Sequence, residues 1–86
     1  QINIGKPYPN PFNNQVKIPI EVTQHSRVKI DIIDVRGRVV DTLIDRELSL
    51  GKHEFEWNSN LHASGVYIFR ATIDKTSYNE KILLLK

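Results

Sequence analysis

Residues 64–73 hold the sequence feature that most limits how this chain can fold. After Ser64 and Gly65, β-branched and aromatic residues alternate with the two-residue period of a β-strand. One face of this strand is apolar throughout, and the other is apolar only in its first half. Such a strand is predicted to lie inside a sheet and not at its edge. The apolar face consists of Tyr67, Phe69, Ala71 and Ile73, and the mixed face of Val66, Ile68, Arg70 and Thr72.

Six further stretches of alternating or apolar residues, separated by turn residues, are typical of strands, and no helical stretch occurs. Strands with turns every 8–12 residues indicate an all-β, immunoglobulin-like antiparallel β-sandwich of about seven short strands. The 86 residues are enough for a single domain, spanning residues 1–86. The strands are expected at residues 2–4, 16–22, 27–34, 39–44, 52–57, 66–73 and 78–86.

Several local features refine this prediction. Pro19 cannot donate to a ladder, so one side of its strand is expected at a sheet edge or a bulge. Asp31 alternates with apolar neighbours and is expected to point outward. The Asp-x-x-Gly pattern of residues 34–37 predicts a type I turn. Residues 45–51 are expected to form a mostly polar loop, with Gly51 at a positive φ.

The segment 6–14 carries three prolines at alternate positions, which excludes a helix or a central strand. We expect an extended, stiff segment with a turn near Asn10. Tyr8 and Phe12 are predicted to cap an open end of the core, the alternative being an exposed aromatic binding platform. Trp57 is the only tryptophan and the largest candidate for the core.

No convergent set of catalytic side chains can be recognised. His25, His53 and His62 lie apart, and no metalloprotease, serine-hydrolase, phosphate-loop or dinucleotide motif occurs. We therefore predict a protein that is not an enzyme and needs no cofactor. With no cysteine, disulfides and thiolate metal sites are excluded. Four aspartates near one hairpin have oxygen ligands suited to calcium, but their spacing and the neighbouring bases favour a solvated face: Asp31, Asp34, Asp41 and Asp45.

The charge distribution argues against two classes of partner. The chain has twelve Lys and Arg residues and ten Asp and Glu residues, which gives a net charge of +2, and residues of the two signs are interspersed along the sequence. A nucleic-acid binder would carry a basic stripe, so no nucleic acid is expected. The longest apolar run, residues 82–85, is far shorter than the roughly 20 residues of a membrane span, so no membrane insertion is expected. Because the chain opens on Gln1, we expect it to be part of a longer protein.

Taken in order, the motifs resemble the C-terminal sorting domain (type A) of the type IX (Por) secretion system, over nearly the whole chain. The opening signature, residues 8–13, is the most specific part, and the lysine-framed aliphatic ending is the last. Ile33, where the family usually has an aromatic residue, and the segment 14–15 depart from the pattern. The residues that carry the resemblance are Tyr8, Pro9, Asn10, Pro11, Phe12, Asn13, Asp34, Gly37, Arg38, Gly51, Trp57, Gly65 and Tyr67, followed by Lys81, Ile82, Leu83, Leu84, Leu85 and Lys86.

The resemblance implies a non-catalytic module at the C-terminus of a larger exported protein. Its partners would be the N-terminally fused cargo, the type IX translocon, and the sorting and cleavage proteins of that system. The cargo would pass through the periplasm in transit and then be secreted or attached to the outer-membrane cell surface. In the family the final strand carries much of the recognition, which assigns a sorting-signal role to residues 81–86.

The last strand has apolar residues on both faces. At a sheet edge, its unpaired backbone could add to a partner's sheet or to a second copy of the chain. In a central position, both faces would be core. Two other function classes stay open: an Ig-like accessory domain resembling that of the flagellar hook-capping protein, and a carbohydrate-binding module. The first does not predict the proline-rich opening, and the second requires Tyr8, Tyr67 or Tyr78 on an open surface.

Overall fold

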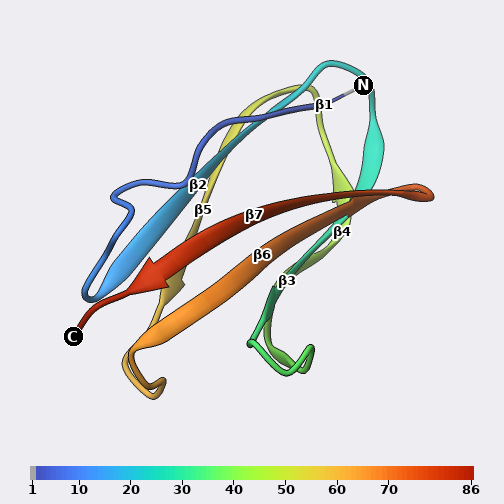
Figure 1. Cartoon of the computed structure of the whole chain (residues 1–86). Helices are drawn as coiled ribbons and strands as arrows, with labels where there is room; N and C mark the ends of the chain where they lie inside the picture. Colours follow the sequence, from blue (N-terminus) through green and yellow to red (C-terminus); the bar gives the residue numbers. More distant parts are fainter. Residues whose placement is uncertain (1) are drawn as a thin grey trace.

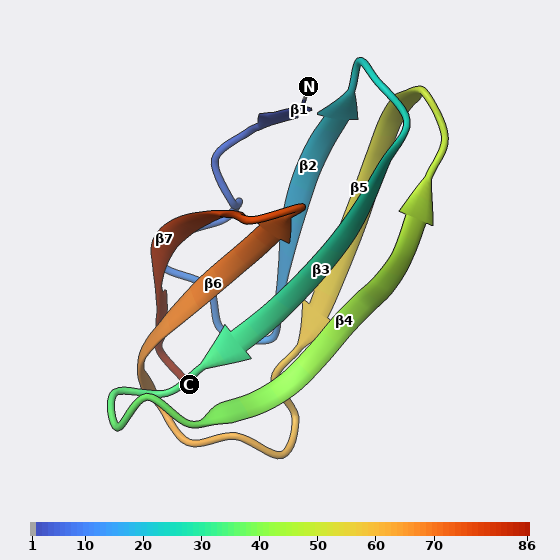
Figure 2. The same ribbon diagram turned by 90° about the vertical axis from the view of Figure 1, so that its right-hand side faces the viewer.

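The computed structural model describes residues 2–86, which form two antiparallel sheets packed face to face (Figure 1). One sheet has the strand order β1-β2-β5 and the other β4-β3-β6-β7. Figure 2 shows the two layers, with β2 and β5 behind β3 and β6. The predicted all-β sandwich is confirmed. Its strands are β1 (Ile2–Ile4), β2 (Gln15–Val22), β3 (Ser26–Ile33), β4 (Val39–Leu48), β5 (Gly51–Asn58), β6 (Gly65–Ile73) and β7 (Thr76–Leu84).

Strand β6 lies inside its sheet, as its two faces predicted. It pairs with β3 on one side and with β7 on the other. Its apolar face is buried, and its mixed face, which includes Val66 and Arg70, is half-buried. Strand β4 lies beside β3, whereas in a constant-type immunoglobulin domain the fourth strand belongs to the opposite sheet. The sandwich is therefore immunoglobulin-like with one strand exchanged between sheets.

Trp57 lies at the centre of the core between the sheets. Its side chain is fully buried, and its ring centroid lies 5.8 Å from that of Phe12 and 5.1 Å from that of Tyr67. The indole Nε1 donates to Asp41 Oδ2 at 3.0 Å, so the one polar atom of the ring is satisfied. The surrounding core consists of Val16, Ile18, Ile20, Val22, Val28, Ile30, Ile32, Leu48, Phe69, Ala71, Ile73, Ile82 and Leu84.

The local predictions for the glycine turns are confirmed, whereas β2, which carries Pro19, lies between β1 and β5 in continuous register with β5, so that Pro19 is at neither a sheet edge nor a bulge. Pro19 lies between the β1–β2 pairing and an isolated bridge of Tyr8, and there its carbonyl accepts from Gly5 N at 2.9 Å. Its missing N–H therefore falls in a gap of the ladder. Gly37 N donates to the Asp34 carbonyl at 3.0 Å and Gly37 has φ +84°, while Gly51 has φ +122°.

Two further local predictions are wrong. Strand β4 does not end at Ile44 but continues to Leu48, because residues 45–47 pair with β3 and form a charged edge strand. The side chain of Leu48 is fully buried. Asp31 is not solvated but only 4% exposed. It lies on a central strand between β4 and β6, and Thr42 Oγ1 donates to its Oδ1 at 2.9 Å. The neighbouring strands β4 and β6 thus cover the carboxylate of Asp31, which the alternation of polar and apolar residues alone predicts to be exposed to solvent.

We expect Trp57→Ala to lower the free energy of unfolding by about 3–5 kcal/mol, because it leaves a large cavity among Phe12, Tyr67 and their neighbours. Urea denaturation followed by circular dichroism measures this loss. Leu61→Ala is the control, since Leu61 is 95% exposed and its truncation should change stability by no more than about 0.5 kcal/mol. Equal losses in the two variants would contradict the central place of Trp57.

Candidate functional site

Strand β7 lies at the edge of the four-stranded sheet and pairs only with β6. Ile82 and Leu84 are fully buried in the core. Leu83, on the opposite face, is half-buried, and Leu85 is 52% exposed. The sequence left two positions open for the last strand, the edge or the centre of a sheet, and the structure places this strand at the edge.

A second segment lies along the outer side of β7 near its C-terminal end (Figure 1). We name residues 8–12 the edge clasp. Its central contact is the side chain of Asn10, whose Nδ2 donates to Lys81 O at 3.0 Å and whose Oδ1 accepts from Leu83 N at 3.0 Å. One carboxamide thus supplies both a donor and an acceptor, as the backbone of a neighbouring strand would.

Phe12 continues this pairing with its backbone. Phe12 N donates to Leu83 O at 2.9 Å, and Leu85 N donates to Phe12 O at 2.8 Å. These bonds form a parallel bridge between Phe12 and Leu84, while the Phe12 ring enters the core beside Trp57. The prediction of an unpaired outer edge is therefore wrong between Lys81 and Leu85, where four hydrogen bonds join β7 to the edge clasp.

The other end of the edge clasp is attached to the opposite sheet. Tyr8 exchanges two backbone hydrogen bonds with Lys17 of β2, at 2.9 and 2.8 Å, and its hydroxyl donates to Glu54 of β5. This hydrogen bond raises the pKa of Tyr8. The Tyr8–Pro9 and Asn10–Pro11 peptide bonds are cis. Tyr8 is 46% exposed, so the prediction that both rings cap the core holds only for Phe12.

The last residue, Lys86, contacts the loop between β5 and β6. Lys86 N donates to Ser64 Oγ at 2.9 Å, and Lys86 Nζ donates to Asn60 O at 3.1 Å. Residues 81–86 are therefore held from two sides, by the edge clasp and by this loop. Leu85, between the two attachments, keeps half of its surface open to solvent.

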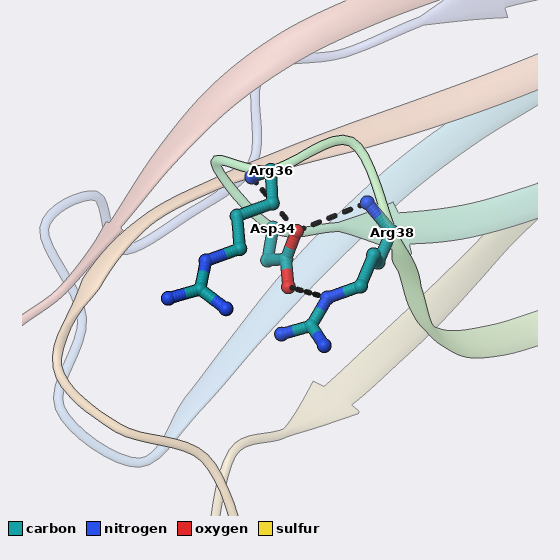
Figure 3. A network of polar contacts seen from close by, with 3 residues as sticks. All are labelled: Asp34, Arg36 and Arg38. Carbon is teal, nitrogen blue, oxygen red and sulfur yellow. Dashed lines mark hydrogen bonds and ion pairs between the residues drawn. The ribbon is translucent and has the colours of Figure 1, made fainter.

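The Asp34 turn forms a separate polar network (Figure 3). Asp34 Oδ1 accepts from the backbone N–H groups of Arg36 at 2.9 Å and Arg38 at 3.0 Å, and Oδ2 accepts from Arg38 Nε at 3.1 Å. The backbone hydrogen bond from Arg38 is the main cause that lowers the pKa of Asp34. The Asp-x-x-Gly-Arg motif therefore builds a turn.

The remaining motif residues also have structural contacts. Tyr67, near the start of β6, donates from its hydroxyl to Ala63 O at 2.6 Å, the arrangement of a tyrosine corner. Tyr67 is 8% exposed, which removes it from the surface that a carbohydrate-binding module would need. The structure brings Phe12, Trp57 and Tyr67 together, whereas Gly51 pairs with Val22 at the far end of β5.

Each of the four aspartates considered for calcium accepts a hydrogen bond from another group. Beyond the contacts of Asp31, Asp34 and Asp41 already described, Arg27 Nη2 donates to Asp45 Oδ1 at 2.9 Å. Across residues 2–86, no group of three or more acidic, histidine or cysteine side chains is arranged to hold a metal ion. Within the same residues, no helix is long and apolar enough to cross a membrane.

The most informative contact that sequence reasoning missed is that of Asn10 with β7. A local signal for it existed, because Asn side chains readily bond backbone groups and Asn10 lies between two prolines that hold its backbone in place. The partners, however, lie 71 and 73 residues away. No local pattern identifies them.

Asn10→Ala is expected to lower the free energy of unfolding by about 1–2 kcal/mol, because it removes two hydrogen bonds at a partly solvated edge. Amide hydrogen exchange should accelerate at Leu83, whose N–H loses its acceptor. Asn13→Ala is the control, since Asn13 is an exposed residue of the same segment. An unchanged exchange rate at Leu83 in Asn10→Ala would contradict the edge clasp.

The lowered pKa of Asp34 predicts an acid-dependent loss of stability. Its contribution is complete above the pKa of an unfolded Asp, about pH 4, and is lost as the pH falls through the lower pKa of the folded state. The wild type should therefore lose more stability than Asp34→Asn as the pH falls below about 4. Thermal melting of both proteins as a function of pH tests this, and parallel curves would contradict it.

Comparison with known proteins identifies the family. The family described as the secretion system C-terminal sorting domain matches residues 6–85. No curated protein matches the sequence. The matched region contains the edge clasp, the Asp34 turn, the Trp57 core and β7. The family supports a C-terminal sorting signal of type IX secretion, which implies an exported protein that is secreted or attached to the cell surface. The chain therefore belongs to the type IX secretion system C-terminal sorting domain family.

Proposed function

We propose that this chain is a single, non-catalytic sorting domain that directs an N-terminally fused cargo through the type IX outer-membrane translocon. The observation that carries the proposal is the family match over residues 6–85. The cargo would cross the periplasm, and it would then be released or anchored at the cell surface. Sorting and cleavage proteins of the same system would act on it there.

We further propose that the translocon recognises residues 81–86. The exposed ends of this segment are Lys81 and Lys86, and between them Leu83 is half-buried and Leu85 is 52% exposed. Its surface is therefore apolar between two cations, while Ile82 and Leu84 anchor it in the core. Apolar side chains held in place lose little conformational entropy on binding, which favours recognition.

Export of a passive reporter fused ahead of Gln1, in a bacterium with the type IX machinery, tests this function. The intact fusion should be exported, and a fusion that ends at Glu80 should be retained. Because that truncation also removes Ile82 and Leu84 from the core, a point variant is needed. Leu85→Asp should lower export about tenfold, the effect of losing roughly 1.4 kcal/mol of binding.

Leu50→Asp is the matched control. Leu50 is 65% exposed and, like Leu85, lies outside the strands, so the same change of side chain should leave export unaltered. Thermal melting of both variants establishes that they are folded. Retention of the intact fusion would refute the sorting function. Equal export of the Leu85 and Leu50 variants would instead refute recognition through the last residues.

A further inference from the structure

The outer edge of β7 has a covered half and an open half. Over the covered half, the backbone groups of Lys81, Leu83 and Leu85 point toward the edge clasp and bond to it. Because outward-pointing residues alternate along a strand, and β7 keeps a continuous register with β6, Ser77 and Asn79 direct their N–H and C=O groups to the same side. Among residues 2–86, no strand pairs with these groups.

The other long edge strands carry their own protection against strand addition. Strand β4 has the charged residues Asp45, Arg46 and Glu47 and two register shifts against β3. Strand β5 alternates charges along its length, including Lys52 and Glu54. Residues 76–79, in contrast, contain no charge, no proline and no bulge. The open half of β7 is therefore the edge best suited to receive another strand.

The edge clasp shows what kind of ligand this edge binds. On the covered half, a short segment satisfies the outward backbone groups of β7 with four hydrogen bonds, two from the Asn10 side chain and two from the Phe12 backbone. An extended polypeptide offers the same donors and acceptors at the same repeat. The chain thus already carries a substitute for a partner strand over half of the edge.

We infer that the outer edge of β7, from Ser77 to Leu85, is a docking surface for an extended strand of a protein of the export machinery, with the edge clasp as its displaceable placeholder. This inference rests on the proposed function and adds the mode of binding. The partner strand first pairs with Ser77 and Asn79, where nothing has to leave. It then replaces the bonds of Asn10 and Phe12 with equivalent bonds of its own.

A second copy of the chain fits this surface less well than a foreign strand. The second copy has its own edge clasp over residues 81–85, so that two copies can pair only over the short open half. A foreign strand that displaces the edge clasp gains the whole length of the edge. Leu83 and Leu85, the apolar side chains of the segment proposed for recognition, also lie along that length.

Asn79→Pro tests the docking mode in the reporter-export assay. The N–H of Asn79 points away from β6, so proline removes no ladder bond of the folded domain but removes the donor that a docking strand needs. Asn79→Ala keeps that N–H and is the matched control. We expect at least tenfold lower export for Asn79→Pro than for Asn79→Ala, with melting temperatures that agree within a few degrees. Ser77→Pro and Ser77→Ala form a second such pair, in case proline at 79 prevents folding.

A disulfide tests the displacement of the edge clasp. Asn13 and Leu85 are exposed, line one shallow groove and follow the bridged pair Phe12–Leu84. The chain has no cysteine of its own, so the double variant Asn13→Cys/Leu85→Cys forms a defined lock. Export of the oxidised double variant should fall well below that of the same double variant kept reduced. Equal export of the oxidised and the reduced double variant would overturn the placeholder role.

The outcomes separate this inference from the function on which it rests. Normal export of folded Asn79→Pro and Ser77→Pro, together with loss of export in Leu85→Asp, would overturn strand docking and leave the sorting function intact. Retention of the wild-type fusion in the cell would overturn both the sorting function and the strand docking that rests on it. A wild-type chain that is dimeric in size-exclusion chromatography, with Asn79→Pro monomeric, would reassign the edge to self-association and overturn the foreign partner.

Discussion

The edge clasp is the connection on which the rest of this sandwich depends. Within five residues it bonds to β2 through the backbone of Tyr8, places the ring of Phe12 against Trp57, and bonds to β7 through Asn10 and the Phe12 backbone. The two sheets otherwise meet mainly through apolar side chains and the Trp57–Asp41 hydrogen bond, and the edge clasp adds further directional bonds between them. Because apolar packing alone permits sliding between layers, these bonds fix the position of β7 relative to β2.

The family motif can be understood as a set of structural contacts grouped around this connection. Trp57 fills the space between the Phe12 and Tyr67 rings and bonds to Asp41 on β4, while Tyr67 closes the loop before β6 through Ala63. The Asp34 turn is separate and closes the β3–β4 hairpin with its own hydrogen bonds. These motif residues therefore have structural roles in the folded domain, and residues 81–86 are the segment that we propose for recognition.

The sequence predicted those parts of the fold that depend on local chemistry. Alternation identified β6 and its central place, and the Asp34–Gly37 spacing identified the turn. Contacts between residues far apart in the sequence could not be predicted in this way. The extension of β4 depends on Asp45 and its neighbours meeting β3, and the burial of Asp31 depends on the strands on either side.

The candidate site likewise depends on contacts between distant residues, which local sequence patterns do not predict. Apolar residues on both faces of β7 were consistent with an edge or a centre, and only pairing resolves the two. The proline-rich opening was recognised as stiff, but stiffness does not say which strand the segment bonds. Tyr8 and Phe12 are separated by three residues and have opposite exposures, since one faces Glu54 at the surface and the other enters the core.

The 73-residue separation between Asn10 and Leu83 has a consequence for how the domain is made. A ribosome that has synthesised everything up to Glu80 has produced the edge clasp and its partner Lys17 on β2, but none of the backbone groups that the edge clasp bonds at residues 81–85. Until Leu85 emerges, Phe12 has no strand to pair with and the sandwich lacks its edge. Closing a contact this distant carries a loop-closure entropy cost, which slows folding. The bonded edge of the sandwich therefore requires synthesis through Leu85, and a chain that stops before this residue lacks it.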